Sequence, residues 1–336
     1  MCRVQRHAHD QDGALDGRTN QGTDCIPYLL EVTQWVDRDR LTDMNAPKCT
    51  ETDYINFLVA TPHSYSCVEA SKVQPERANQ PVHDASTRLL LQLEPEAEAL
   101  WRESRLLVER TRGLLVVDDS MLDKPHATKM EVVTHHWSGK HRRAVRGINL
   151  ITTLWTDGER HISCDYRIYD KVHAGLSKNG HFLTPLKAKR LVNLDRQGMM
   201  QLSQTAIAAT GALVFLKGYG LIKVFRIVAP DGDIEYWATR DLALGELDHL
   251  RLSEHTFIIE NYHRGIKQFC GLERSQARLA RPQRNHIGLG LRAFLRIEHY
   301  AFRHGCSWFE AKVNIVRAAV TAYLLNPLYL LPGSTV

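Results

Sequence analysis

Residues 114–120, LLVVDDS, join four apolar residues to a pair of carboxylates. A short continuous apolar run is typical of a strand at the centre of a sheet, buried on both faces. Two more strand-like stretches follow at 147–155 and 162–169, and residues 156–159 between them are a strong turn signal. The sequence therefore predicts a central strand followed by a hairpin of two further strands, with the two carboxylates ending the first strand.

A second informative stretch, residues 258–268 (IIENYHRGIKQ), has the spacing of an amphipathic helix. At 100° per residue, Glu260, Arg264 and Lys267 fall within about 60° of one another. The apolar residues on the opposite side are Ile258, Tyr262, Ile266 and Phe269. A glutamate four residues before an arginine is also common on salt-bridged surface helices. Spacing alone therefore leaves a structural and a functional interpretation open.

The charge is concentrated around these two stretches. The whole chain has a formal net charge of +5, but residues 251–303 alone hold ten Lys/Arg against four Glu. Residues 124–146 hold six Lys/Arg and four His against one Glu. Such local excess of positive charge indicates a polyanionic partner.

The cysteines and the apolar runs argue against a zinc-ribbon, secreted or membrane protein. The seven cysteines include no C-x2-C pair, so a zinc ribbon is not predicted. Their odd number, and the lack of an apolar leader, indicate a reducing compartment. No apolar run reaches the ~18 residues of a membrane span. We expect a cytoplasmic protein that does not bind membranes.

Three stretches occur together in one order: residues 115–125 (LVVDDSMLDKP), residues 136–171, which begin HWSGKH and end YRIYDK, and residues 260–271 (ENYHRGIKQFCG). In this combination the chain resembles the bacterial insertion-sequence transposases of the DDE type. Within them it resembles the group with a Glu-x6-Lys signature on the last catalytic helix. The likeness spans about residues 44–322, and the ordered combination is specific where any single stretch would be weak.

The resemblance implies an α/β fold: a ribonuclease-H-like core with a helical N-terminal region and a β-strand insertion. Asp118 matches the first catalytic acid, with its neighbour Asp119 as the second choice, and Glu260 matches the third acid. Family members hold two Mg2+ (or Mn2+) ions with carboxylates, and the ions stabilise the attacking and leaving oxygens of a phosphodiester. Asp118 and Glu260 are therefore also the candidate metal ligands.

The implied partner is double-stranded DNA, as transposon ends and as target, in the bacterial nucleoid; a homodimer is left open. Lys267 matches the signature lysine that contacts the DNA backbone. The other candidate DNA-binding residues are Lys140, His141, Arg142, Arg143 and Arg264.

The chain departs from the family pattern in two places. The family has a Tyr and an Arg seven and four residues before the Glu, where this chain has Ser253 and Thr256. The family's second acid should lie on a strand that follows a helix beginning near residue 177. Here the sequence passes from that helix start directly to residues 183–190, which resemble a later strand, so roughly forty residues are missing by typical element lengths. Asp195, in an expected turn, is a poor substitute, and we expect the core to be incomplete.

These observations divide the chain into six parts. The first is a disordered or non-native extension ahead of Met44, and the second is a helical region that could bind DNA. Two parts of the catalytic core follow, separated by a β-rich insertion, and a tail ends the chain. In the insertion, Lys217, Lys223 and Arg226 could contact DNA. The expected ranges are 1–43, 44–112, 113–182, 183–245 for the insertion, 246–325 and 326–336.

The expected function is that of an insertion-sequence transposase, which cleaves DNA and transfers strands at transposon ends with the help of metal ions. Because the second acid is missing, we expect this copy to be catalytically defective. The alternative is a non-catalytic protein that binds transposon ends and represses intact transposase.

Overall fold

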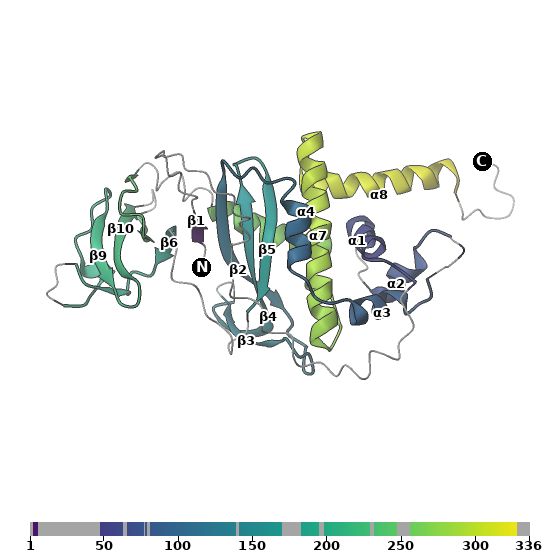
Figure 1. Cartoon of the computed structure of the whole chain (residues 1–336), viewed down its shortest axis with the longest axis horizontal. Helices are drawn as coiled ribbons and strands as arrows, with labels where there is room; N and C mark the ends of the chain where they lie inside the picture. Colours follow the sequence, from purple (N-terminus) through teal and green to yellow (C-terminus); the bar gives the residue numbers. More distant parts are fainter. Residues whose placement is uncertain are drawn as a thin grey trace, which may run out of the picture.

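The computed structural model describes residues 3–5, 48–62, 66–76, 78, 81–138, 141–169, 183–194, 198–228, 232–246 and 256–327, with only the backbone for residues 3–5 and for Thr256. The described elements mix helices and strands, and every described strand pairing is antiparallel. Figure 1 shows a central sheet between a β-rich part and a group of helices.

The centre of the sheet is the strand and hairpin expected from the sequence, except that the first strand does not end at the two carboxylates: it continues to Asp123, so Asp118 and Asp119 lie in its middle. Strand β2 (Leu114–Asp123) pairs along its whole length with β4 (Arg143–Thr156), which pairs in turn with β5 (His161–Ile168). Strand β3 (Thr134–Ser138), which we did not predict, pairs with the first residues of β4. In β2 only alternate residues are fully buried, from Val116 to Leu122. The prediction of burial on both faces was therefore wrong: β2 buries one face completely and the other in part.

An unexpected strand lies beside β2. Strand β1 (Arg3–Gln5) pairs with β2, with Val4 opposite Val116, and also with β6 (Leu183–Leu186). The expected extension at residues 1–43 did not include this element, and residues 6–47 lie outside the described residues. Strand β1 occupies the edge of β2 that the missing segment was expected to leave open, and it joins the two halves of the sheet.

The predicted β-rich insertion forms strands and has its own hydrophobic core. Strands β6, β11 (Ile234–Thr239), β10 (Gly220–Val228) and β9 (Ala212–Leu216) lie side by side. The short strands β7 (Leu191–Val192) and β8 (Met200–Gln201) and the 3-10 helix η2 (Leu202–Gln204) adjoin them. The core of this unit consists of Val192, Leu202, Ile207, Val214, Leu216, Ile222, Val224, Tyr236 and Ala238.

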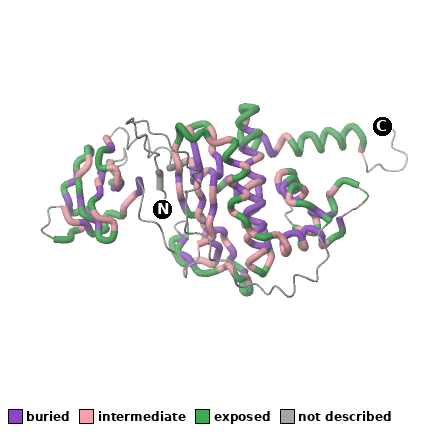
Figure 2. The backbone as a smooth tube through the Cα atoms, viewed as in Figure 1, coloured by how far each residue is buried: buried purple, intermediate pink, exposed green. Residues whose placement is uncertain are grey.

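Helices lie on the other side of the sheet from the β-rich unit (Figure 1). The N-terminal region is helical, as predicted, and Ser66 caps α2 by accepting from the Glu69 amide. The C-terminal helices are longer, and Figure 2 shows α7 buried along much of its length while α8 is mostly exposed. Among the described helices, none is long and apolar enough to cross a membrane. The seven helices with printed bounds are α1 (Glu51–Ala60), α2 (Cys67–Lys72), α3 (Ala85–Gln92), α4 (Glu98–Ser104), α6 (Thr256–Cys270), α7 (Ala280–His304) and α8 (Trp308–Leu325).

Aromatic packing fixes the position of α6 against α7. The ring of Phe294 lies 5.3 Å from that of Tyr262 and 4.9 Å from that of Trp308, both edge to face, an arrangement that aromatic pairs prefer. Gly265 of α6 faces Phe294, and a Cβ at that position would lie 2.9 Å from its Cε2. The absence of a side chain at Gly265 therefore lets α6 approach closely, and this sets which face of α6 meets β2.

Candidate functional site on strand β2 and helix α6

Helix α6, which carries Glu260, packs against β2, which carries Asp118. The Asp118 side chain of β2 is buried, and its Oδ2 lies 3.9 Å from Nδ1 of His263 on α6. The other ring nitrogen of His263, Nε2, is hydrogen-bonded to Thr152 Oγ1 at 2.7 Å. Glu260 is exposed and lies one helical turn, about 5 Å, before His263 on the same side of α6. His263, which we did not single out from the sequence, is therefore the residue of α6 that lies beside Asp118.

Asp119 does not share this position. Successive side chains of a strand point to opposite faces, and Asp119 is exposed where Asp118 is buried. The second choice for the first acid is therefore less suited than Asp118 to face α6.

Burial sets the protonation of the Asp118–His263 pair. It raises the pKa of the Asp118 carboxyl. Burial, together with the nearby Lys267 ammonium, lowers the pKa of His263 to about 3. His263 is therefore neutral at pH 7 and does not form an ion pair with Asp118, since burial disfavours the charged form of each group.

The predicted DNA-backbone lysine is held within the protein. Lys267 Nζ donates to the Met121 carbonyl oxygen at 2.5 Å and lies 3.3 Å from Glu273 Oε1. The same Glu273 oxygen accepts from the Asp123 amide at 3.2 Å. Lys267 therefore attaches α6 to the end of β2 in this conformation, in place of the free ammonium that we expected.

The basic residues ahead of β4 lie in the connection between β3 and β4. His141 Nε2 is 3.1 Å from Asp123 Oδ2, so this ring is also partnered within the protein. Arg142 and Arg143 are exposed, and Arg142 has a φ of 49°, in the left-handed region typical of tight turns. Lys140 lies outside the described residues. The structure thus leaves the Arg142–Arg143 pair accessible to a ligand.

Much of the positive charge of residues 251–303 is neutralised by ion pairs. Four of its cations are paired: Lys267 with Glu273, Arg281 with Glu94, Arg292 with Glu51 and Glu103, and Arg296 with Glu103. Within the part of the chain that the structure describes, five others make no ion pair: Arg264, Arg274, Arg278, Arg284 and Arg303. The surface available to phosphates is therefore smaller than the net charge suggests.

The cations proposed for the β-rich unit also differ in how accessible they are to phosphates. Lys223 Nζ donates to the Leu244 carbonyl oxygen at 2.8 Å and lies over the Phe225 ring. Lys217 is exposed in the turn after β9, and Arg226 is half-buried on β10. Lys217 is thus the most accessible of the three.

The described residues at this contact do not fit a site for two metal ions. Such a site needs carboxylates around both ions, and here Asp118 is buried beside a neutral histidine while Glu260 is exposed to solvent. Across the described ranges, no group of three or more His, Cys, Asp and Glu side chains is arranged to hold a metal ion. Asp195, Ser253 and the segment from 170 to 182 lie outside those ranges.

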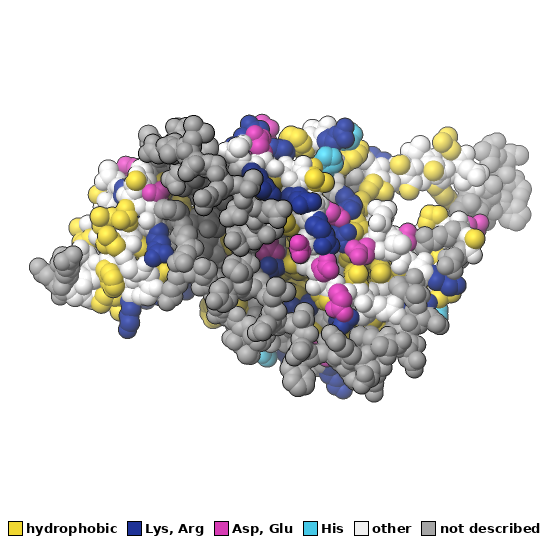
Figure 3. Space-filling view, in the orientation of Figure 1, with side chains coloured by type: hydrophobic (Ala, Val, Ile, Leu, Met, Phe, Trp, Pro, Cys, Tyr) yellow, Lys and Arg dark blue, Asp and Glu magenta, His cyan; other side chains and the backbone are white. Residues whose placement is uncertain are grey.

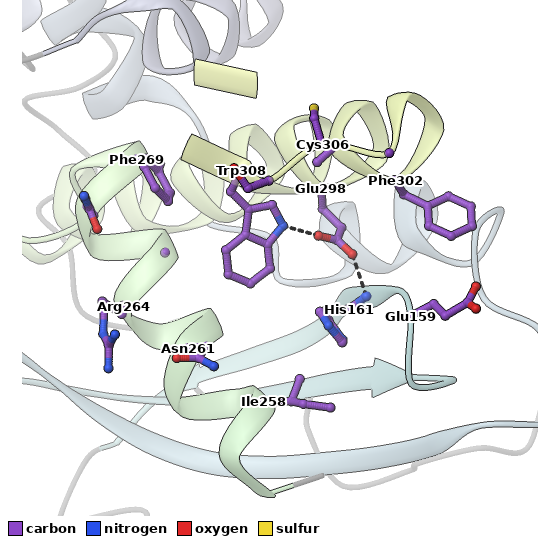
Figure 4. A pocket seen from close by; sticks show the side chains of 15 residues that line it. Glu159, His161, Ile258, Asn261, Arg264, Phe269, Glu298, Phe302, Cys306 and Trp308 are labelled. Carbon is purple, nitrogen blue, oxygen red and sulfur yellow. Dashed lines mark hydrogen bonds between the residues drawn. The ribbon is translucent and has the colours of Figure 1, made fainter. Parts of the chain in front are cut away.

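A groove of about 670 Å³ lies on the other side of α6, where α6, the corner between α7 and α8 and the β4–β5 turn meet (Figure 4). Its floor includes Glu298, whose carboxylate accepts from the His161 amide at 2.6 Å and from Trp308 Nε1. Burial raises the pKa of Glu298. Arg264 lines this groove too, next to Asn261. No spacing in the sequence indicates this site, because His161 and Glu298 are 137 positions apart.

The buried histidines predict acid sensitivity. Burial lowers the pKa of His263 to about 3 and that of His286 to about 4. An unfolded histidine titrates near 6.5, so the unfolded state binds protons first as the pH falls, and stability decreases below about pH 6.5. From pH 7 to pH 5 we expect a loss of about 2 kcal/mol per histidine in the free energy of unfolding, measured with urea.

The comparison of two variants isolates this effect. His263→Gln should remove about half of the pH dependence, whereas His299→Gln, at an exposed position, should leave it unchanged. The raised pKa of Asp118 has the opposite effect on stability. As the pH falls, that carboxyl takes up its proton in the folded state first, so its contribution to stability increases. An unchanged slope in His263→Gln would mean that His263 is not held neutral.

Comparison with known proteins leaves the chain unassigned: no protein-family model matches its sequence, and no curated protein matches it. These comparisons do not test the resemblance carried by the three stretches, and the geometry of β2 and α6 is the observation from which a function can be argued.

Proposed function

We propose that this chain is a DDE-type insertion-sequence transposase that binds duplex DNA but no longer cuts it. The observation that carries the proposal is the β2–α6 contact. The strand with the first predicted acid packs against the helix with the last one, and Asp118 lies 3.9 Å from His263, one helical turn after Glu260. The order β2, β4, β5, with each neighbour antiparallel, supports a ribonuclease-H-like core.

Loss of cleavage follows from the chemistry of the acids. In-line displacement at a phosphodiester uses two divalent ions, and one carboxylate must bridge them. Burial raises the pKa of the Asp118 carboxyl, which opposes the ionised form that Mg2+ or Mn2+ would bind. Intact family members would use these ions; in this chain Asp118 and Glu260 are left without a bridging partner that we can identify.

DNA binding rests on exposed cations on both sides of the acids. Arg142, ahead of β4, and Arg143, the first residue of β4, are exposed, and Arg264 is exposed on α6 one turn after Glu260. Arginine binds phosphate oxygens with charge-assisted hydrogen bonds. A protein that binds transposon ends in the cytoplasm without cutting them would compete with intact transposase for those ends. Such a protein would act in the cell as a repressor of transposition.

The test is binding to duplexes taken from the DNA on either side of the gene, where an insertion sequence carries its inverted repeats. With fluorescence anisotropy at low salt, we expect the repeat duplex to bind more tightly than a shuffled duplex of equal length. Arg264→Ala should weaken binding several-fold by losing a phosphate contact, whereas Gln268→Ala, one turn further along the same helix, should not. Absence of binding to either duplex at low salt would overturn the proposal. Equal binding to both duplexes would contradict the repressor form, because a repressor must distinguish transposon ends from other DNA.

A further inference from the structure

Glu273, in the connection between α6 and α7, is held in place by the end of β2. Its Oε1 accepts from the Asp123 amide at 3.2 Å. Its backbone carbonyl oxygen and that of Ser275 each accept from Nζ of Lys124 at 2.6 Å, and Lys124 is buried. None of these bonds involves Lys267, the cation that Glu273 also contacts. The Glu273 carboxylate is therefore fixed at this corner of the protein independently of its ion pair.

Lys267 is one of several cations that the protein pairs with its own acids, and Figure 3 shows basic and acidic side chains side by side over the middle of one face. The Lys267 Nζ lies 3.3 Å from Glu273 Oε1, and the two side chains are 26% and 30% exposed. Solvent therefore reaches this pair. A partly exposed ion pair stabilises a protein little, and the flexible lysine side chain can exchange one anion for another.

Arg264 places a phosphate-binding cation next to this pair. It is exposed on α6 and, among the described residues, makes no ion pair. Lys267 follows it by three residues, and side chains three apart on a helix are neighbours. A phosphate bound by Arg264 would therefore lie within reach of the Lys267 ammonium, which could leave Glu273 for it.

We propose that the Glu273 carboxylate takes the place of a DNA phosphate on Lys267, and that duplex DNA binds by displacing it. This inference rests on the proposed DNA binding. Glu273 is then a positioning residue: it holds the Lys267 ammonium at the end of β2 and weakens the attraction of α6 for DNA. When a phosphate takes the ammonium, Glu273 keeps its bond to the Asp123 amide, so the exchange leaves the contact between β2 and the α6–α7 connection intact.

Binding of one DNA duplex by the full chain tests the proposal, with Glu273→Gln as the variant. The side-chain oxygen of glutamine still accepts from the Asp123 amide, whereas the charge that holds Lys267 is lost. We expect binding at low salt to tighten about three- to fivefold. The slope of log K against log salt should become steeper by about 1, for one further phosphate contact. Circular dichroism should show the variant folded.

Two controls separate the release of Lys267 from a general loss of negative charge. Glu131→Gln removes an exposed carboxylate that accepts from the Ala280 amide and, in the part of the chain that the structure describes, pairs with no cation. This variant should leave the salt slope unchanged. In a chain that already carries Lys267→Ala, Glu273→Gln should also leave the slope unchanged, because its effect acts through Lys267.

The outcomes distinguish this inference from the proposed function. If the unchanged protein binds the duplex and a folded Glu273→Gln variant binds it with the same affinity and salt slope, Glu273 does not compete with phosphate and the inference is wrong. An equal gain in the Lys267→Ala chain would also contradict it, since the effect would then be one of net charge. If neither the unchanged protein nor Glu273→Gln binds the duplex at low salt, the proposed DNA binding itself is wrong, and this inference with it.

Discussion

Raising the salt concentration from about 50 to about 200 mM is expected to weaken duplex DNA binding by about 10³-fold. The exposed cations without an ion pair among the described residues include Arg142, Arg143, Arg264, Arg274, Arg278 and Arg303. If all six contact phosphates, counterion release gives a slope of log K against log salt of about −5. Anisotropy titrations of one duplex across a salt series measure this slope directly.

Variants show how much residues 124–146 and residues 251–303 each contribute to the salt dependence of DNA binding. Replacing both Arg142 and Arg143 by Ala should make the slope less steep by about 2. Replacing Arg292 by Ala should barely change it, because that arginine is already paired with Glu51 and Glu103. Binding that does not respond to salt would exclude phosphate contacts as the main source of affinity.

A chain that begins at Met44 is expected to be markedly less stable than the full chain. It lacks β1, which pairs with β2 on one side and β6 on the other. Without β1, the edge of β2 at Leu115–Val117 loses its hydrogen-bonded neighbour, and the β-rich unit loses its link to the central sheet. We expect a loss of about 3 kcal/mol in the free energy of unfolding, at about 1 kcal/mol per backbone hydrogen bond, and easier proteolysis between the two parts.

A point substitution separates the role of β1 from that of the remaining N-terminal residues. Val4→Pro removes a backbone donor from the strand and should reproduce much of the loss, because proline is excluded from paired interior strands. Val4→Thr keeps strand propensity and should be close to neutral. If the Met44 chain is as stable as the full chain, Met44 is a sufficient start, as the sequence suggested, and β1 is dispensable.

The elements predicted correctly are those whose signals are local. The apolar run before Asp118 and the turn signal at 156–159 specify β2, β4 and β5 through contacts between neighbours in the sequence. The helical spacing around Glu260 identified an exposed acid and a buried Tyr262 on opposite sides of α6. The Ser66 cap of α2 is also a local feature, because capping depends on residues three positions apart.

The features that escaped prediction depend on contacts between distant segments. Strand β1 pairs with a strand more than a hundred residues away, and no local pattern indicates that partner. The helical spacing shows only that His263 belongs to an amphipathic helix, whereas its burial depends on contacts with β2 and Thr152. Lys267 carries the signature spacing, but its contact with Met121 depends on how α6 crosses β2. Propensity and periodicity describe single elements, and tertiary packing decides which side chains remain free.

The most direct test of the central claim is a cleavage assay on end-labelled duplex carrying the inverted repeat, with Mg2+ or Mn2+ present. We predict no nick at the repeat end and no strand transfer, under conditions in which the same protein binds the duplex, because Asp118 and Glu260 lack the third acid that two ions require. The matched control is Asp118→Ala, which should be indistinguishable from the unchanged protein. A nick at the repeat end that Asp118→Ala abolishes would contradict the account, since it would show that another residue completes the site.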